Sequence, residues 1–216
     1  MKMKTYKILD IKNLTSNTFL LRAERPDVNI IAGQCFNVGI PGAGVNREYS
    51  MYSGADEPYL EFLIRKQEDG IVSPYLAELR KGDFIEIDGP YGEFCLKNTV
   101  RPEQHYLFLA TGTGIAPFHS FVKTYSELNY TIIHGIRYPE EQYQYADYKD
   151  GNCISCISKN IVGKTSYRLT DYIMKNPVDP ESIVYLCGNR NMIIDAFEIL
   201  RAQHVPGDNI YTEVFF

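Results

Sequence analysis

A glycine turn between an expected strand and an expected helix is the sharpest chemical signal in the sequence. Residues 107–118 read LFLATGTGIAPF, an apolar run of strand length that ends at Gly112 and Gly114 and leads into helical spacing. Such a turn gathers backbone N–H groups at a helix N-terminus, where a phosphate group can bind. Pro117 occupies the third position of the common dinucleotide fingerprint G-x-G-x-x-G. Taken alone, the turn is therefore interpreted more simply as a tight structural connection.

The second candidate for a residue with a chemical role is Cys187. Cys187 ends an apolar run, which would put its thiol at the carboxyl edge of a parallel sheet, where ligands bind. A buried cysteine at a strand end is also commonly a small apolar filler. Cys153 and Cys156 are the first and fourth residues of an expected strand and point to opposite faces. With five scattered cysteines in all, we expect reduced thiols and no metal site.

The first half of the chain predicts an antiparallel barrel. Short runs at 6–11, 18–23, 35–40, 47–52, 59–65 and 83–88 alternate in polarity and are separated by turn residues. One helix is expected between the last two runs, with Ser73 as its N-cap, Pro74 at its first position and a stop at Gly82.

The second half predicts an α/β domain. Apolar runs at 105–110, 130–136, 153–157, 183–187 and 210–215 alternate with segments of helical spacing. This alternation of strand-length and helical segments favours a five-stranded parallel sheet with helices on both faces. We therefore predict a two-domain β plus α/β protein, with an antiparallel β-barrel over 1–100 and the α/β domain over 101–216.

Charge and hydropathy exclude some classes of partner. The net charge of -5 and the pI near 5.4 argue against nucleic-acid binding, which usually leaves a basic footprint. No apolar run approaches the roughly 20 residues that span a bilayer, and residues 1–7 are not followed by the apolar region of a signal peptide. We expect a cytoplasmic protein that binds neither nucleic acid nor membrane.

Five motifs occur in the order found in the ferredoxin–NADP reductase superfamily. They are REYS at 47–50, GIVS at 70–73, GPYGEF at 89–94, the turn at 110–118 and CGNRNM at 187–192. From about residue 34 to residue 216 the chain resembles a flavin-dependent reductase of this family, most closely the compact bacterial ferredoxin/flavodoxin–NADP reductases. The resemblance implies that the barrel binds FAD, that the α/β domain binds NADP(H), and that the flavin lies at their junction.

The resemblance also implies roles for the barrel residues. Arg47 would pair with the flavin pyrophosphate through its charged fork, and Tyr49 would stack on the isoalloxazine. Ser50 would hydrogen-bond near the flavin nitrogen that accepts hydride. The loop residues that would supply amides to the pyrophosphate are Gly70, Ile71, Val72 and Ser73.

In the α/β domain the resemblance places Cys187 against the nicotinamide carbon that donates hydride. Phe216 would cover the second face of the flavin with Phe215 beside it, although either phenylalanine could do so. Glu213 would lie near Ser50 and Cys187 as a proton donor or a partner-binding group. The predicted catalytic residues are Ser50, Cys187, Glu213 and Phe216, and the further nucleotide-binding residues are Gly112, Thr113, Gly114, Pro117, Gly188 and Met192.

Basic residues favour NADP(H) over NAD(H). An NAD site usually has an acidic residue near the end of the second strand, whereas a basic residue accommodates the 2′-phosphate of NADP. This chain has Arg137 at that place and no acidic residue before Glu140. The residues that the resemblance assigns to the 2′-phosphate are Arg137, Ser158, Lys159 and Arg168. Two positions depart from the family, since Lys159 stands where arginine is more usual and Tyr167 where glycine is frequent.

We weigh three functions, of which the third is disfavoured because Arg47, Tyr49, Ser50 and Ser73 are intact. The first is a flavoenzyme that moves hydride between NADP(H) and FAD and single electrons to or from a ferredoxin or flavodoxin, as a monomer or weak dimer. The second is an NAD(P)H-dependent flavin or quinone reductase, or the reductase component of an oxygenase. The third is a non-catalytic electron-transfer subunit of a larger complex, which would predict damaged flavin motifs.

Overall fold

The computed structural model describes residues 4–96, 100–159 and 167–215, and the chain divides into two compact units. The first unit contains the chain up to Leu96 together with His119–Thr124, and the second contains the remainder. In the segment His119–Thr124 the His119 ring stacks on the Tyr52 ring of the same unit, with 3.7 Å between centroids. The boundary predicted between residues 100 and 101 stays a prediction.

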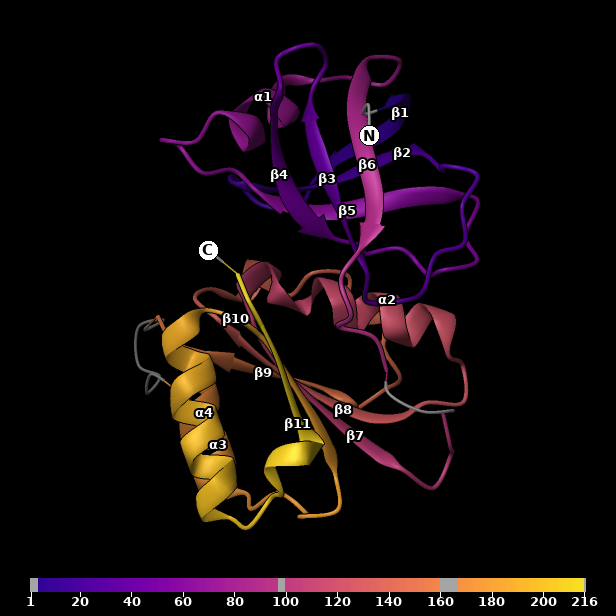
Figure 1. Ribbon diagram of the computed structural model, residues 1–216. Helices are drawn as coiled ribbons and strands as arrows, with labels where there is room; N and C mark the ends of the chain where they lie inside the picture. Colours follow the sequence, from indigo (N-terminus) through magenta and orange to yellow (C-terminus); the bar gives the residue numbers. More distant parts are fainter. Residues whose placement is uncertain (1–3, 97–99, 160–166, 216) are drawn as a thin grey trace. The chain divides into compact units, whose positions relative to one another are not determined.

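The first unit is an antiparallel six-stranded sheet that curls into a barrel-like fold (Figure 1). Its order is β4-β3-β6-β1-β2-β5, and a bridge between Met51 and Phe62 links the chain after β4 to β5. Alternation sets the faces, as in β6, where Ile85 and Ile87 are buried and Phe84 is exposed. The strands are β1 (Lys4–Asn13), β2 (Thr18–Glu24), β3 (Cys35–Ile40), β4 (Val45–Ser50), β5 (Tyr59–Arg65) and β6 (Phe84–Tyr91).

The one helix predicted here forms, but its start and end differ from the prediction. Helix α1 spans Val72–Glu78, with Ile71 rather than Ser73 at the N-cap position. The Ser73 hydroxyl instead accepts the Gln67 N–H at 3.0 Å, which closes the turn before the helix. The predicted stop at Gly82 is also wrong, because Leu79 is already extended, with ψ 162.

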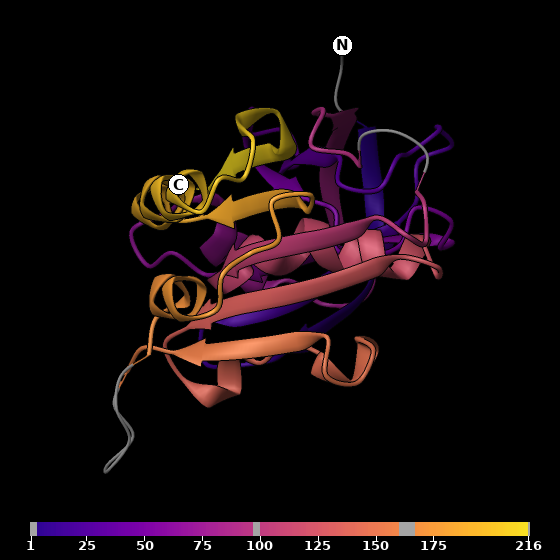
Figure 2. The ribbon, with the colours of Figure 1, turned by 90° about the horizontal axis from the view of Figure 1, so that it is seen from below.

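The second unit is a five-stranded parallel sheet, as predicted, in the order β11-β10-β7-β8-β9 (Figure 2). The strands are β7 (His105–Thr111), β8 (Asn129–Ile136), β9 (Cys153–Ile157), β10 (Ile183–Gly188) and β11 (Ile210–Val214). The helices are α2 (Ala116–Thr124), α3 (Leu169–Lys175) and α4 (Arg190–Ala202), with short 3-10 turns η1 (Gly112–Ile115), η2 (Pro139–Glu141), η3 (Tyr145–Asp147) and η4 (Gly207–Asn209).

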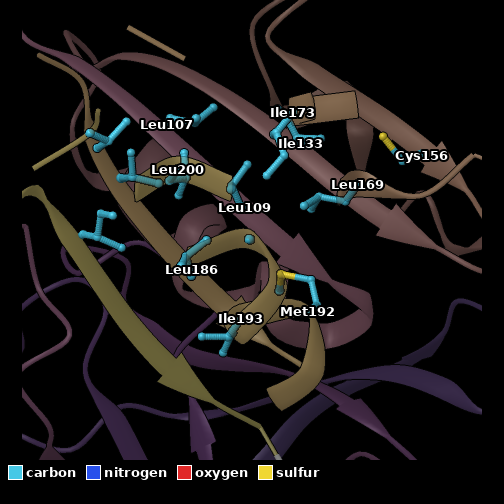
Figure 3. Packing of buried hydrophobic residues seen from close by; sticks show 14 residues of the cluster. Leu107, Leu109, Ile133, Cys156, Leu169, Ile173, Leu186, Met192, Ile193 and Leu200 are labelled. Atoms are coloured by element: carbon cyan, nitrogen blue, oxygen red, sulfur yellow. The ribbon is translucent and has the colours of Figure 1, made fainter. Parts of the chain in front are cut away.

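Helices cover both faces of the parallel sheet. On one face, aliphatic side chains of the strands pack against α3 and α4, for example Leu109 and Leu186 against Leu169 and Leu200 (Figure 3). On the other face lie aromatic strand residues such as Phe108, whose ring stacks on Phe118 of α2 with 4.8 Å between centroids. Burial of both faces explains why these strands read as continuous apolar runs rather than alternating ones.

Within the described residues, no helix is long and apolar enough to cross a bilayer. The same residues contain no group of three or more His, Cys, Asp or Glu side chains that could hold a metal ion. All five cysteines are free thiols.

Candidate functional site

Strand β4 presents the predicted flavin-binding side chains of the first unit. Residues two apart share a face of a strand, so Arg47 and Tyr49 lie on one face. The Arg47 side chain is exposed and donates from Nη1 to the Asn46 carbonyl at 2.7 Å. The Tyr49 ring is half-buried, 6.4 Å from Phe62 between centroids, and burial raises the pKa of its phenol to about 12. A neutral aromatic ring beside an exposed cation suits a planar ligand that carries phosphate.

Ser50 and the loop before α1 complete this group in the first unit. Ser50 is buried at the end of β4, where it pairs with Cys35 of β3. Helix α1 packs against β3 and β4, so the loop at 70–73 belongs to the same part of the unit. In that loop Gly70 and Ile71 are exposed, whereas the side chains of Val72 and Ser73 are buried.

In the second unit the structure brings two distant motifs together at the carboxyl edge of the sheet. A Cβ built at Gly114 would lie 2.5 Å from the Cys187 carbonyl oxygen, so only glycine permits this approach of η1 to β10. Gly188 has φ +130, and a Cβ there would collide with the Thr111 hydroxyl. That hydroxyl accepts the Asn189 N–H at 2.9 Å. The turn and the segment after Cys187 therefore each have a glycine, Gly114 and Gly188, at the point where the other segment comes closest.

Cys187 and Glu213 form a pair at the same edge. They are register partners in β10 and β11, and the Cys187 thiol donates to Glu213 Oε2 at 3.7 Å. Cys187 is fully buried, and burial together with the Glu213 carboxylate raises the pKa of the thiol well above its ordinary value. The group at this position is therefore a neutral thiol and a hydrogen-bond donor, not a thiolate nucleophile.

The chain end beyond β11 is partly described. The Phe215 N–H donates to the Gly188 carbonyl at 2.9 Å, so the Phe215 backbone is tied to the glycine that follows Cys187. Phe216, predicted as the flavin cover, lies outside the described residues. Met192 contributes its side chain to the core against the sheet (Figure 3), and its predicted nucleotide contact stays a prediction.

The four residues predicted to bind the 2′-phosphate come from the ends of β8 and β9 and the start of α3. Ile136 and Ile157 are register partners, so the residues that follow them are adjacent. The Lys159 N–H donates to the Arg137 carbonyl at 3.0 Å. Arg168 precedes α3, and its N–H donates to Asp171 at 2.8 Å. The exposed side chains are those of Arg137, Lys159 and Arg168, while Ser158 is partly buried and donates to the Ile136 carbonyl.

Sequence reasoning missed two residues that contact the glycine turn. Thr111 closes the turn onto Asn189, and His134, fully buried in β8, lies 2.8 Å from the Gly112 carbonyl oxygen. For His134 the available signal was an imidazole in the mostly apolar run 130–136, a polar group that must find a hydrogen-bond partner when it is buried.

Two family models match the chain, one in each half. Residues 6–95 match the oxidoreductase FAD-binding domain, and residues 108–197 match the oxidoreductase NAD-binding domain. The first match contains Arg47, Tyr49 and Ser50, and the second contains the glycine turn and Cys187.

Curated relatives include reductases of two kinds. The chain is 28% identical over 226 residues to the electron transfer component of toluate 1,2-dioxygenase from Pseudomonas putida, covering 96% of this chain and 66% of that protein. It is 33% identical over 140 residues to the flavodoxin/ferredoxin–NADP reductase of Escherichia coli, covering 62% of this chain and 56% of that protein. The matches therefore span from somewhat over half to about two thirds of these relatives.

A solved structure with both nucleotides resembles the whole chain. The ferredoxin NADP+ reductase from Neisseria gonorrhoeae with bound FAD and NADP superposes with a TM-score of 0.78 at 25% identity, covering 100% of each chain.

Proposed function

Since the chain belongs to the ferredoxin–NADP reductase superfamily, with that superfamily's FAD-binding and NAD-binding domains in order, we propose that it is an NADPH-dependent flavoprotein reductase. It would exchange electrons between NADP(H) and a ferredoxin or flavodoxin. The observation that carries the proposal is the meeting of the Gly112–Ile115 turn with Cys187 and Gly188 at the carboxyl edge of the parallel sheet. Ligands of open α/β sheets bind at this edge.

The first unit supplies the residues that would hold FAD. When bound, FAD would accept two electrons together and release them one at a time, which side chains alone cannot do. Arg47 is free to turn its guanidinium toward a pyrophosphate, because its present acceptor is a backbone carbonyl on the surface. The neutral Tyr49 ring offers a stacking surface, and Ser50 offers a hydroxyl at the end of the same strand.

The second unit supplies the residues that would hold the nicotinamide nucleotide. Backbone N–H groups at the start of the turn suit a pyrophosphate. Cys187 keeps its proton and donates to Glu213, so it would stand near the nicotinamide ring as a small neutral group rather than a charge. The reaction needs orientation of two rings, and no side chain has to act as a general base.

NADP(H) is proposed over NAD(H). Three exposed cationic side chains gather where β8 and β9 end and α3 begins, which matches the dianionic 2′-phosphate. Cytoplasmic location is proposed from the five free thiols, which suit a reducing compartment. We further propose a monomer or weak dimer.

The likeness to the toluate 1,2-dioxygenase component supports a second candidate. That relative matches 96% of this chain and is an electron transfer component. A chain of this kind could deliver electrons to an oxygenase partner instead of a free ferredoxin.

The test is a comparison of electron acceptors. NADPH and NADH oxidation by the purified full chain would be measured with ferredoxin, flavodoxin, free FMN and a soluble quinone in parallel. The proposal predicts that NADPH exceeds NADH in kcat/KM and that a ferredoxin or flavodoxin exceeds the small acceptors. Turnover with FMN or quinone alone would contradict the proposed partner, and no turnover with any acceptor would contradict the proposed enzyme.

A further inference from the structure

A buried histidine holds the first residue of the glycine turn. His134 of β8 is fully buried, with Nε2 2.8 Å from the Gly112 carbonyl oxygen and Nδ1 3.0 Å from the Tyr145 hydroxyl. A carbonyl oxygen can only accept, so Nε2 carries the proton. Nδ1 must then accept the hydroxyl proton of Tyr145. The contacts therefore fix both the tautomer and the orientation of the ring.

His134 and the two side chains that extend its hydrogen bonds, Tyr145 and Cys153, are all uncharged. Burial lowers the pKa of His134 to about 4, so the imidazole is uncharged near pH 7. Burial raises the pKa of the Tyr145 phenol, and it raises the pKa of the Cys153 thiol, which hydrogen-bonds to Tyr145, to about 12. A series of uncharged hydrogen bonds therefore runs from Cys153 through Tyr145 and His134 to the Gly112 carbonyl.

The Gly112 end of the turn is packed less tightly than its Gly114 end. Gly114 is pressed against β10, but a Cβ built at Gly112 would meet no atom of the described residues within 4 Å. Gly112 also has φ +54, a conformation open to glycine and rare in other residues. The hydrogen bond from His134 is thus a side-chain contact that restrains the Gly112 carbonyl in addition to the backbone hydrogen bonds of η1.

The direction of that carbonyl sets the direction of the next amide. A trans peptide group is planar, with C=O and N–H pointing in opposite directions. When the Gly112 carbonyl points to His134, the Thr113 N–H of the same peptide group points the opposite way, away from His134. An N–H at the start of this turn is the donor that a phosphate would use.

We propose that His134, oriented by Tyr145, is a positioning residue that holds the Gly112 carbonyl and thereby aims the Thr113 N–H at the pyrophosphate of the nicotinamide nucleotide. This inference rests on the proposed function, because it concerns the turn that would bind NADP(H).

Two substitutions of His134 separate its two hydrogen bonds. In His134→Gln the longer side chain places an amide N–H near the Nε2 position, so the bond to the Gly112 carbonyl is kept. In His134→Asn the shorter amide reaches only the Nδ1 position, where it accepts from Tyr145, and the Gly112 carbonyl loses its side-chain donor. Calorimetry with NADP+ and with adenosine 2′-monophosphate, which has the 2′-phosphate and no pyrophosphate, is the readout.

His134→Asn is expected to weaken NADP+ binding about tenfold, the value of one well-placed hydrogen bond. Affinity for adenosine 2′-monophosphate should not change, and His134→Gln should restore NADP+ binding to near the wild-type level. The matched control is His105→Gln, at the opposite end of β7, where the ring contacts Ser182 and Thr131 at 3.0 Å each. This control should leave both affinities unchanged.

The outcomes distinguish the inference from the proposed function. If the wild type binds NADP+ and His134→Asn binds it equally well, the inference is wrong and the proposed function stands. If both ligands weaken together in His134→Asn, the role is general packing and the inference is again wrong. Failure of the wild type to bind NADP+ or NAD+ would overturn both. Should His134→Asn not fold, Tyr145→Phe serves instead, with a roughly threefold loss for NADP+ alone expected from the unfixed ring.

Discussion

At the scale of single residues, burial sets the protonation state of the groups that line the turn and the sheet edge. Cys187 is a thiol and His134 a neutral imidazole, because each is removed from water and the charged form of each is disfavoured. Neither group is therefore suited to act as a charged catalyst near neutral pH. Both are suited to donate a directed hydrogen bond and to fill space beside a ring.

Replacing Cys187 should affect the rate of reduction more than binding. Cys187→Ala removes the donor to Glu213 and opens space at the end of β10. We expect the single-turnover rate of flavin bleaching by NADPH to fall at least about tenfold, since small misplacements of reacting groups are costly. The NADP+ affinity should stay the same. Stopped-flow measurements would check this, with Cys187→Ser, which keeps a hydrogen-bond donor, as the matched variant. An unchanged rate in the alanine variant would show that Cys187 has no role in flavin reduction.

His134 should make the protein sensitive to acid. Its pKa is about 4 in the folded chain, against 6.5 for an ordinary histidine, so the unfolded chain takes up the proton first as pH falls. The stabilisation is present above pH 6.5 and is lost as pH falls from 6.5 toward 4. His134→Gln lacks this group. The variant should lose about 2 kcal/mol less unfolding free energy than the wild type between pH 7 and pH 4.5.

Urea denaturation at the two pH values measures this difference. The pKa of His105 is also lowered by burial, but that residue is present in both proteins and its contribution cancels. Equal losses in the two proteins would show that His134 is not held neutral.

At the scale of elements, the sequence predicted where strands and turns lie better than how they are held together. The strand-length runs from 105–110 to 210–215 became β7 to β11 because both faces of that sheet are buried. The first helix was misplaced because Ser73 bonds backward to Gln67 instead of capping, a choice that depends on the turn beneath it. The contact of Gly114 with Cys187 joins residues far apart in the chain, and no local pattern specifies it.

Because η1 lies very close to β10, one added methyl group at Gly114 should lower the stability of the protein markedly. Gly114→Ala places a Cβ against the Cys187 carbonyl, and the resulting overpacking should cost about 1–3 kcal/mol. The Tm should drop by several degrees, and NADP+ binding should weaken because the turn moves. Gly207→Ala is the matched control, since a Cβ at Gly207 meets no atom of the described chain within 4 Å. Equal thermal melts of the two variants would contradict the close packing described for η1.

The ends of β8 and β9 and the start of α3 should decide the choice of nucleotide. Replacing Lys159 and Arg168 together by alanine removes two of the three exposed cations, and each charged hydrogen bond to phosphate is worth about tenfold. We expect the ratio of kcat/KM for NADPH to that for NADH to fall about 100-fold, mainly through the KM for NADPH. Lys149→Ala, a basic residue beyond the other end of the sheet, is the control. A ratio that does not move would place the 2′-phosphate elsewhere.

At the scale of the whole molecule, the resemblance in sequence and the match to two domain families agree on the order of the two nucleotide-binding halves. Five short motifs sufficed for this because they occur in the family's order across both matched domains, from Arg47 in the first to Gly112 in the second. The electron partner was not predictable in the same way. Partner choice depends on the exposed surface as a whole, and a net charge of -5 gives no single patch that identifies an acceptor.

The central claim is that one chain binds both FAD and NADP(H) and lets electrons pass between them. Anaerobic titration of the purified protein with NADPH, followed through the visible absorbance of FAD, tests it most directly. We predict a yellow protein with one FAD per chain whose colour is bleached by about one equivalent of NADPH, because each nucleotide carries two electrons. A protein that takes up no FAD on reconstitution, or bound FAD that NADPH leaves fully oxidised, would contradict the account.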